Sequence, residues 1–290
     1  MDKYIHQSVL LKESIDLLNI RPKKAYLDCT LGSGGHSVEI LKKGGKLYGL
    51  DVDPEAIKRA ETRINQTCPG AFFKLKLGNF SKLKEHAQEL KLTSLSGILM
   101  DLGLSSDQLE YKDKGFSFQI DSPLDMRADH SLGVTAEDLV NGLSKNELTK
   151  LFKKYGQEQY ALAIANHIIL RRKQSPITTT LELANLVSKV KKRTGATHPA
   201  TKVFQALRIA VNDELNSLET ALPQAFDLLE KNGKLVVISF HSLEDRIVKT
   251  FIKDQPSLKN LTIKPITPSD QELTKNPRAR SAKLRAATKI

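Results

Sequence analysis

The stretch LDCTLGSGGHSVEI, residues 27–40, places three glycines directly behind a short apolar run. Residues 25–28 have the composition of a buried strand, and residues 37–41 that of the start of a helix. Glycine loses more conformational entropy on folding than any other residue, so glycines this dense indicate a backbone that must come close to something. Strand, glycine turn and helix form the unit that places a nucleotide-like ligand at a helix N-terminus.

The same alternation of strand and helix continues on both sides of this unit. Two more strands are buried and end in an acid, Asp51 and Asp101, and a third alternates apolar residues with lysine. We predict strands over 25–28, 46–51, 71–77 and 97–101, and helices over 9–19, from Ser37, from Pro54 and from Ser81. This alternation predicts a parallel sheet with helices on both faces.

The pattern changes after about residue 110 and strands resume only at 234–240. Between them, capping boxes predict helix starts at Thr135 with Asp138, Ser144 with Glu147 and Thr179 with Glu182. We therefore expect an α/β domain formed by residues 1–110 and 210–290, with an inserted all-helical domain over 111–209.

The end of the sequence gives three more expectations. Ser242 with Asp245 predicts a helix cap, and residues 261–266 a last strand. The segment after Glu272 carries six basic residues and no acid, so we expect it to lack order on its own and to become ordered on RNA.

Composition limits the classes of protein to consider. The 290 residues, 40% apolar and 27% charged, are typical of a soluble globular protein, without a membrane-spanning run or a secretion signal. Two cysteines provide neither a disulfide framework nor a zinc quartet, so we expect a reducing cytoplasm and no metal site. The net charge of +12 favours a polyanionic partner.

The glycine turn departs from the known phosphate-binding motifs. Counting from Gly32, the third glycine of a dinucleotide fingerprint would fall at position 37, which is Ser37, and no Gly-Lys-Ser/Thr follows. S-adenosylmethionine has no phosphates and needs a close glycine turn and an acid that accepts the ribose hydroxyls. Asp51 lies about twenty residues beyond the glycines, as a ribose-binding acid should. The alternative is a helix cap, which we favour for Asp53.

Asp101 ends the strand that borders the methyl-acceptor site in methyltransferases that use S-adenosylmethionine. The amine of cytosine is a poor nucleophile because its lone pair is delocalised into the ring. An acceptor such as Asp101 can bind the amine hydrogens and orient the lone pair. Leu102-Gly103 follows where base-amine methylases often carry Pro-Pro, so these residues alone leave the substrate open.

Longer motifs narrow the choice. They are HQSVLL at 6–11, DCTLGSGGHS at 28–37, LDVDP at 50–54, MDLGLSSDQL at 100–109, GFSF at 115–118, SPLDMR at 122–127, THPATKVFQALRIAVNDEL at 197–215, VISFHSLEDRIVK at 237–249 and NPRARSAKLRA at 276–286. Through them the chain resembles, from end to end, the bacterial family that N4-methylates a decoding-centre cytidine of 16S ribosomal RNA. The resemblance implies a Rossmann-like class I S-adenosylmethionine-dependent methyltransferase domain with an inserted helical domain, acting on rRNA in the small ribosomal subunit.

The resemblance also implies site residues. The cofactor contacts would be Gly34, Gly35, His36, Asp51, Phe80, Asp101 and Gln108. The catalytic candidates are Asp101 and His241. The substrate candidates are Ser105, Ser106, Phe116, Phe118, Arg127, Arg278 and Arg280.

Several of these residues have a plainer alternative. His36 would shape the turn and contact the cofactor through its backbone, and Phe80 would flank the adenine or lie in the core. Phe116 and Phe118 would stack on a flipped base or be core aromatics, and Arg127 would pair with Asp125 to shape its loop. His241 would orient the base or accept a proton, or simply begin a helix.

Two other functional classes stay open at this point. A small-molecule methyltransferase would not need the basic C-terminal segment, and a non-catalytic RNA-binding module would not need the three glycines with Asp51. The sequence leaves open the oligomeric state, a homodimer included, and the need for a catalytic base.

Overall fold

The computed structural model describes residues 8–103, 114–193, 195 and 197–290. The chain forms two compact units, one of Met1–Gly103 with Leu215–Ile290 and the other of Leu104–Glu214. We call them the sheet unit and the helical unit. The domain bounds expected from the sequence differ from these by a few residues at each junction.

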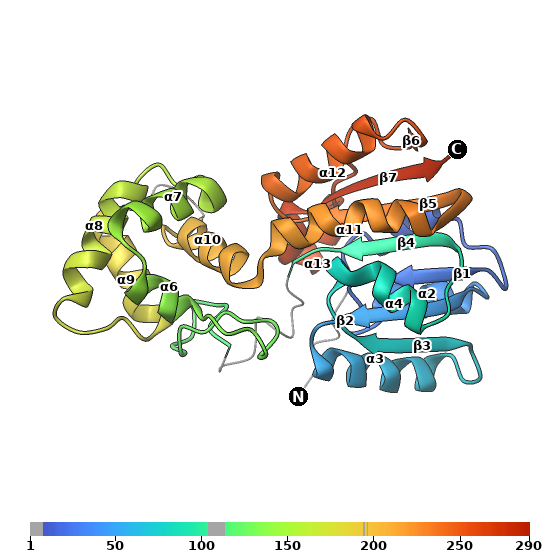
Figure 1. Cartoon of the computed structure of the whole chain (residues 1–290), viewed down its shortest axis with the longest axis horizontal. Helices are drawn as coiled ribbons and strands as arrows, with labels where there is room; N and C mark the ends of the chain where they lie inside the picture. The colour runs from blue at the N-terminus through green and yellow to red at the C-terminus, as the bar shows by residue number, and fades with distance from the viewer. Residues whose placement is uncertain (1–7, 104–113, 194, 196) are drawn as a thin grey trace. The chain divides into compact units, whose positions relative to one another are not determined.

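The sheet unit is built on seven strands in the order β3-β2-β1-β4-β5-β7-β6 (Figure 1). The strands are β1 (Ala25–Asp28), β2 (Lys46–Asp51), β3 (Phe73–Leu77), β4 (Leu95–Asp101), β5 (Leu229–Ser239), β6 (Leu258–Asn260) and β7 (Lys283–Lys289). Strands β1 to β5 pair in parallel, and β7 runs antiparallel to β5 and β6. This is the predicted Rossmann-like α/β fold.

Helices cover both faces of this sheet (Figure 1). They are α1 (Leu11–Leu18), α2 (Gly35–Lys42), α3 (Pro54–Thr67), α4 (Leu83–Glu89), α11 (Glu214–Leu228), α12 (Ser242–Asp254) and α13 (Asp270–Lys275), with short 3-10 helices η1 (Phe80–Lys82) and η2 (Pro277–Ser281). Alternate strand residues point to opposite faces. Leu235 and Val237 therefore pack in the core under α4, α11 and α12, and Val236 and Ile238 in the core under α1, α2 and α3.

The C-terminal segment is part of this sheet, which corrects the expectation that it lacks order. Strand β7 lies between β5 and β6, and Leu284, Ala286 and Ala287 are buried. The strand predicted over residues 261–266 is also wrong, because the strand in this region, β6, covers Leu258–Asn260. Arg285 is only 5% exposed, and its Nε donates to Oδ1 of Asp245 at 2.6 Å, so its charge is compensated inside the protein.

The helical unit contains α6 (Ala136–Gly142), α7 (Lys145–Gly156), α8 (Ala161–Arg172), α9 (Thr180–Val190) and α10 (Thr201–Asn212). The three predicted capping boxes are confirmed at the starts of α6, α7 and α9. Side chains such as Leu148, Phe152 and Leu207 form a core of its own. Within the part of the chain that the structure describes, no helix is long and apolar enough to cross a membrane.

Candidate cofactor-binding site

Three acids lie side by side where parallel strands of the sheet end. Asp28, Asp51 and Asp101 are the last residues of β1, β2 and β4, and these strands are neighbours in the order β2-β1-β4. The carboxyl ends of parallel strands are where ligands bind in open α/β sheets. We call this group the acid cluster.

The glycine turn follows β1 directly and closes over this edge. Gly32 and Gly34 have φ angles of 51° and 74°, in the left-handed region that side chains rarely adopt. A Cβ atom at Gly34 would lie 3.2 Å from the Ala60 Cβ, and one at Gly35 would overlap the Ser8 hydroxyl. Glycine is therefore required here by the backbone conformation and by close packing.

Asp51 holds the turn through both carboxylate oxygens. Oδ2 accepts a hydrogen bond from the Gly32 N–H at 2.8 Å, and Oδ1 accepts one from the Asp53 N–H at 2.9 Å. Burial raises the pKa of Asp51, and these two hydrogen bonds oppose that rise. Asp53 is the N-cap of α3 and accepts from the Glu55 N–H, so the cap predicted for Asp53 is confirmed.

Asp28 is the most enclosed member of the acid cluster, at 1% exposure. Its Oδ2 accepts from the Ser37 hydroxyl at 2.8 Å, and its Oδ1 from the Thr30 N–H at 3.2 Å. Burial raises its pKa to about 6, with a further contribution from the charge of Asp51. Ser37, which in the sequence is notable only as a missing glycine, therefore stabilises the buried carboxylate.

Asp101 has the least satisfied carboxylate of the three. Its Oδ2 lies 3.8 Å from Nδ1 of His36, while its Oδ1 is buried and has no hydrogen-bond partner among the described residues. Burial raises its pKa well above the usual range, and the charges of Asp28 and Glu244 add to this. An unpaired buried acceptor is costly, so it points to a ligand group that donates to it.

His36 connects the turn to the segment before α1. It is 5% exposed, and its Nε2 lies 3.2 Å from the carbonyl oxygen of Val9. Its other ring nitrogen faces Asp101, as described above. The imidazole therefore shapes the turn, in agreement with the alternative drawn from the sequence.

The charge of this edge fits S-adenosylmethionine better than a phosphorylated cofactor. Burial raises the pKa of all three acids; a pyrophosphate would raise these pKa values further, whereas a ligand with an ammonium and a sulfonium group would favour the charged carboxylates. The unpaired Oδ1 of Asp101 offers an acceptor to such a ligand. The residues present therefore fit S-adenosylmethionine, with Asp51 at the position of a ribose-binding acid.

For the remaining cofactor and nearby substrate candidates the structure gives less information. Phe80 starts η1 after β3 and is partly buried against the core that contains Leu50 and Leu83, so adenine contact stays a prediction. Gln108, Ser105 and Ser106 lie outside the described residues.

Two substrate candidates in the helical unit have structural contacts. Phe116 is 8% exposed and belongs to the core, which is the plainer alternative for this ring, and base stacking by Phe116 stays a prediction. Arg127 forms the ion pair predicted with Asp125, donating from Nε and Nη2 at 2.8 Å each. Its Nη1 donates to the carbonyl oxygens of His130 and Leu132, so Arg127 shapes its loop, and a substrate contact by Arg127 stays a prediction.

Phe118 retains part of its surface. Its ring stacks on His198 with centroids 4.5 Å apart and meets Phe204 edge-on at 5.0 Å. Base stacking by Phe118 stays a prediction.

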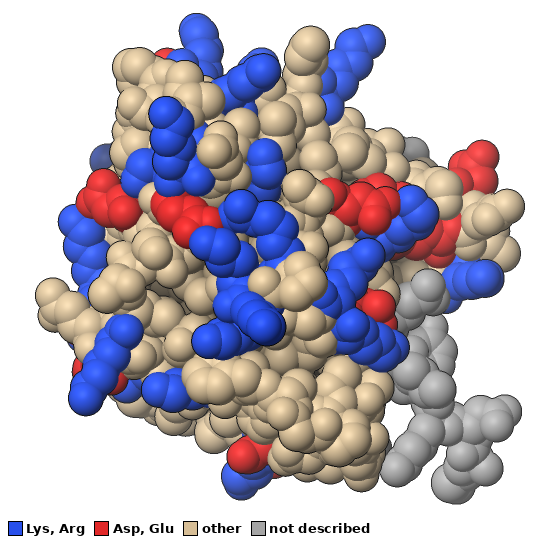
Figure 2. All heavy atoms as spheres, turned by 90° about the vertical axis from the view of Figure 1, so that its right-hand side faces the viewer, with Lys and Arg blue, Asp and Glu red and all other residues tan. Residues whose placement is uncertain are grey.

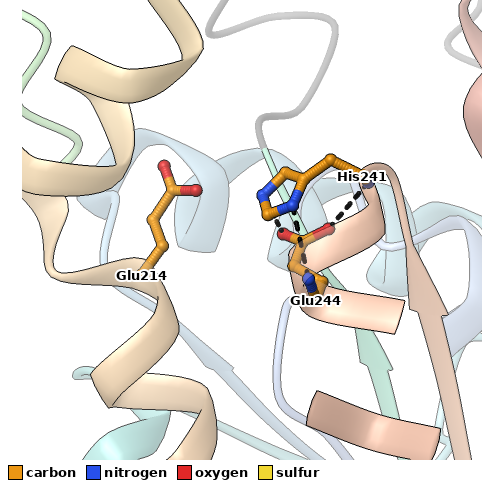
Figure 3. Close-up of side chains that lie close together, drawn as sticks. All are labelled: Glu214, His241 and Glu244. Carbon is orange, nitrogen blue, oxygen red and sulfur yellow. Dashed lines mark hydrogen bonds and ion pairs between the residues drawn. The ribbon is translucent and has the colours of Figure 1, made fainter. Parts of the chain in front are cut away.

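His241 is the N-cap residue of α12 (Figure 3). Its Nδ1 accepts from the Glu244 N–H at 3.3 Å, while the Glu244 carboxylate accepts from the His241 and Phe240 N–H groups at 3.2 and 2.8 Å. The predicted cap at Ser242 with Asp245 is therefore wrong by one residue, and Asp245 pairs with Arg285 instead. This capping box is the helix-entry alternative for His241, and its catalytic role stays a prediction.

Arg278 and Arg280, the substrate candidates near the C-terminus, are exposed in η2. Ala279 between them is buried in the core. The backbone of this segment is thus fixed by packing while both arginines are exposed, and contact with RNA stays a prediction.

Comparison with known proteins places this geometry in a family. Two relatives are named "Ribosomal RNA small subunit methyltransferase H". The protein from Dehalococcoides mccartyi is 46% identical over 312 residues, covering 100% of this chain and 88% of the relative. The one from Carboxydothermus hydrogenoformans is 45% identical over 309 residues, covering 99% of both.

A solved structure from Clostridium thermocellum shares the fold. It is 12% identical and has a TM-score of 0.50, over 99% of this chain and 100% of that one. The model of the MraW methylase family matches residues 3–290. The chain belongs to the MraW methylase family.

Proposed function

We propose that this protein transfers a methyl group from S-adenosylmethionine to the N4 amine of a cytidine in the decoding centre of 16S rRNA, within the small ribosomal subunit. Membership of a methylase family and the names of the relatives support the reaction type and the RNA. The cytidine and its N4 position are inferred from the motifs of the sequence. The observation that carries the cofactor is the acid cluster with its unpaired Asp101 oxygen.

The chain's own residues bind and orient the reactants. S-adenosylmethionine supplies a methyl group on a positively charged sulfur. The glycine turn lets the backbone approach this ligand, and Asp51 accepts hydrogen bonds from its ribose. Oδ1 of Asp101 accepts from a ligand amine, on the cofactor side or the acceptor side.

The transfer does not require a protein base. The lone pair of the N4 amine forms the new bond to the methyl carbon while the bond from that carbon to sulfur breaks and its electrons stay on sulfur. The amine then loses one proton, which water accepts. His241 accepts a backbone hydrogen bond at Nδ1 and so positions the start of α12, and its acceptance of the proton stays a prediction.

The deciding experiment maps modified nucleosides. We expect 16S rRNA from cells that lack this protein to lose one methyl group from a decoding-centre cytidine, measured by mass spectrometry of nuclease fragments. Purified protein with S-adenosylmethionine should restore it on isolated small subunits. Unchanged methylation in the deletion strain would contradict the proposal.

The proposed substrate also implies location and partner. Small ribosomal subunits are cytoplasmic in bacteria, so we expect the protein there. Its partner is 16S rRNA in the subunit, and gel filtration with light scattering will determine whether it acts as a monomer or as a homodimer.

A further inference from the structure

The edge of the sheet opposite the acid cluster is strongly basic. It is the edge where the parallel strands begin, and Figure 2 shows Lys and Arg side chains gathered across its middle, with acids on either side. We call it the amino-edge surface and define it by Arg21, Lys23, Lys24, Lys46, Phe72, Lys231, Lys234 and Lys259.

Segments far apart in the sequence are tied together here. The Lys46 N–H donates to the carbonyl oxygen of Lys24 at 2.7 Å, and the Lys23 N–H to that of Gly44 at 2.7 Å. Lys234 of β5 and Lys259 of β6 lie opposite the same residue of the strand between them, Thr288 of β7, in the register of the sheet. The backbone therefore fixes these cations along one edge.

Acids compensate these cations only in part. Arg21 and Lys24 share one carboxylate, Glu230, at 2.6 and 3.5 Å. The pKa of Lys234 is lowered by burial and by the nearby charges of Arg21 and Lys259. Cations that crowd one another destabilise the free protein, and a bound polyanion would relieve this.

The extent and the chemistry of the surface favour a nucleic-acid strand over a small anion. From Lys46 on β2 to Lys259 on β6 the surface crosses five strand spacings, about 24 Å. One small anion cannot bridge that distance. At the β2 end, Phe72 is 44% exposed, and the Nζ of Lys46 lies 5.6 Å from its ring. An exposed aromatic ring beside cations is the combination that stacks unpaired bases while phosphates are neutralised.

We propose that the amino-edge surface is a second RNA-binding surface, which holds backbone phosphates and an unpaired base of ribosomal RNA away from the methylation site. This inference rests on the proposed function for the identity of the RNA. It predicts that the protein contacts its substrate particle at two opposite edges of one domain.

The test compares two triple variants at the same positions, Lys23→Gln/Lys46→Gln/Lys259→Gln and Lys23→Arg/Lys46→Arg/Lys259→Arg. Binding to small subunits and to 16S rRNA is measured between about 50 and 300 mM salt. We expect the glutamine variant to bind about tenfold or more weakly, with a log–log salt slope smaller by about 2–3, because each phosphate contact contributes about 0.7–0.9. The arginine variant should bind like the wild type.

Methylation of small subunits gives a second readout. The KM for the subunit should rise in the glutamine variant while kcat at saturation stays unchanged, since the surface is remote from the reacting atoms. Phe72→Leu should weaken binding without changing the salt slope.

Other outcomes would overturn the inference. One is an unchanged salt slope of subunit binding in the glutamine variant, and another is an equal loss of subunit binding in the arginine variant. A third comes from binding to phosphatidylglycerol vesicles: if the glutamine variant loses only this binding and still binds subunits like the wild type, the surface is assigned to a membrane. If the wild-type protein binds subunits through this surface but does not methylate them, the proposed function is wrong and the RNA-binding role of the surface is retained.

Discussion

The Nδ1 atom of His36 lies 3.8 Å from Oδ2 of Asp101, across the end of the sheet where β1 and β4 are neighbours. The imidazole is held from its other side by the Val9 carbonyl oxygen at 3.2 Å. The pair thus connects the segment before α1 with the strand that ends in Asp101. It leaves Oδ1 of Asp101 as the acceptor toward a ligand.

The first prediction concerns that oxygen. Asp101→Asn should weaken S-adenosylmethionine binding by about 1.5–3 kcal/mol, the scale of a hydrogen bond to a charged group. The unliganded protein should keep its unfolding temperature, because burial raises the pKa of Asp101 well above its usual range and the amide replaces a carboxyl group that carries little charge before a ligand binds. Calorimetry and thermal melts measure the two effects. Glu39→Gln, the same replacement of a carboxyl group by an amide at the surface pair with Lys42, is the control, and equal affinities in both variants would contradict the role.

The second prediction separates two acids on one turn. Asp51→Ala should reduce S-adenosylmethionine affinity by about 1.5–3 kcal/mol, since it removes the ribose acceptor and frees the Gly32 N–H. Asp53→Ala should instead cost about 1 kcal/mol of stability through the lost helix cap, with little change in affinity. Titration calorimetry together with urea unfolding distinguishes them. The interpretation fails if both variants lose only stability.

The third prediction is a pH dependence of stability. Burial raises the pKa of Asp28 to about 6 from 3.8, so the folded protein holds this proton more tightly than the unfolded chain. The resulting stabilisation is present at low pH and is lost as the pH rises from about 4 to about 6. Its full size is about 3 kcal/mol, from the linkage between pKa and stability.

Asp28→Asn removes this titration. Its unfolding free energy relative to wild type should therefore increase between about pH 4 and pH 6 and then stay level. Urea unfolding across this range measures the difference. A difference that is the same at both ends of the range would show that Asp28 does not titrate there.

The fourth prediction concerns strand β7. Arg285→Gln should destabilise the sheet unit by about 3 kcal/mol, because it leaves the largely buried Asp245 without its close partner. Lys283→Gln should cost less than about 1 kcal/mol, since Lys283 is 38% exposed and lies 3.6 Å from Asp245. Chemical denaturation compares the two. Similar costs would mean that the buried pair contributes no more than an exposed one.

The fifth prediction concerns Arg278 and Arg280. Because packing of Ala279 fixes their backbone, Arg278→Gln/Arg280→Gln should keep the thermal stability of wild type. The log–log salt slope of subunit binding should fall by about 1–2, with S-adenosylmethionine affinity unchanged. The lysine pair at the same positions retains the charge and should preserve the slope. A loss of cofactor affinity would assign these residues to the cofactor site instead.

Much of this fold is readable from local patterns. The bounds of β1 and β2 follow from their apolar runs and terminal acids, and the three capping boxes mark helix starts because their residues bond to one another. Gly32 and Gly34 predict the turn because glycine readily adopts the positive φ angles found there. These features depend on neighbours in the sequence.

Apart from the cap of α12, which was shifted by one residue, the failures involve partners distant in the sequence. KLRAATK in β7 lacks the β-branched alternation of a strand and takes its conformation from β5 and β6 on either side. Arg285 is one cation of a basic segment in the sequence, and its partner Asp245 lies 40 positions away. Phe116 has a base-stacking and a core interpretation in the sequence, with the core favoured for an aromatic ring, and its burial becomes visible only through packing against other helices.

The position of β7 has a consequence for how the protein is made. A ribosome synthesises β5 and β6 before residues 283–289, yet in the finished sheet these two strands meet only through β7. Until then the edge of β5 lacks the neighbour that will bond to it, and nascent chains carry an exposed strand edge of the kind that promotes association. Chains that stop before residue 283 keep that edge, so the cell should find and degrade such fragments rather than accumulate a partly active enzyme.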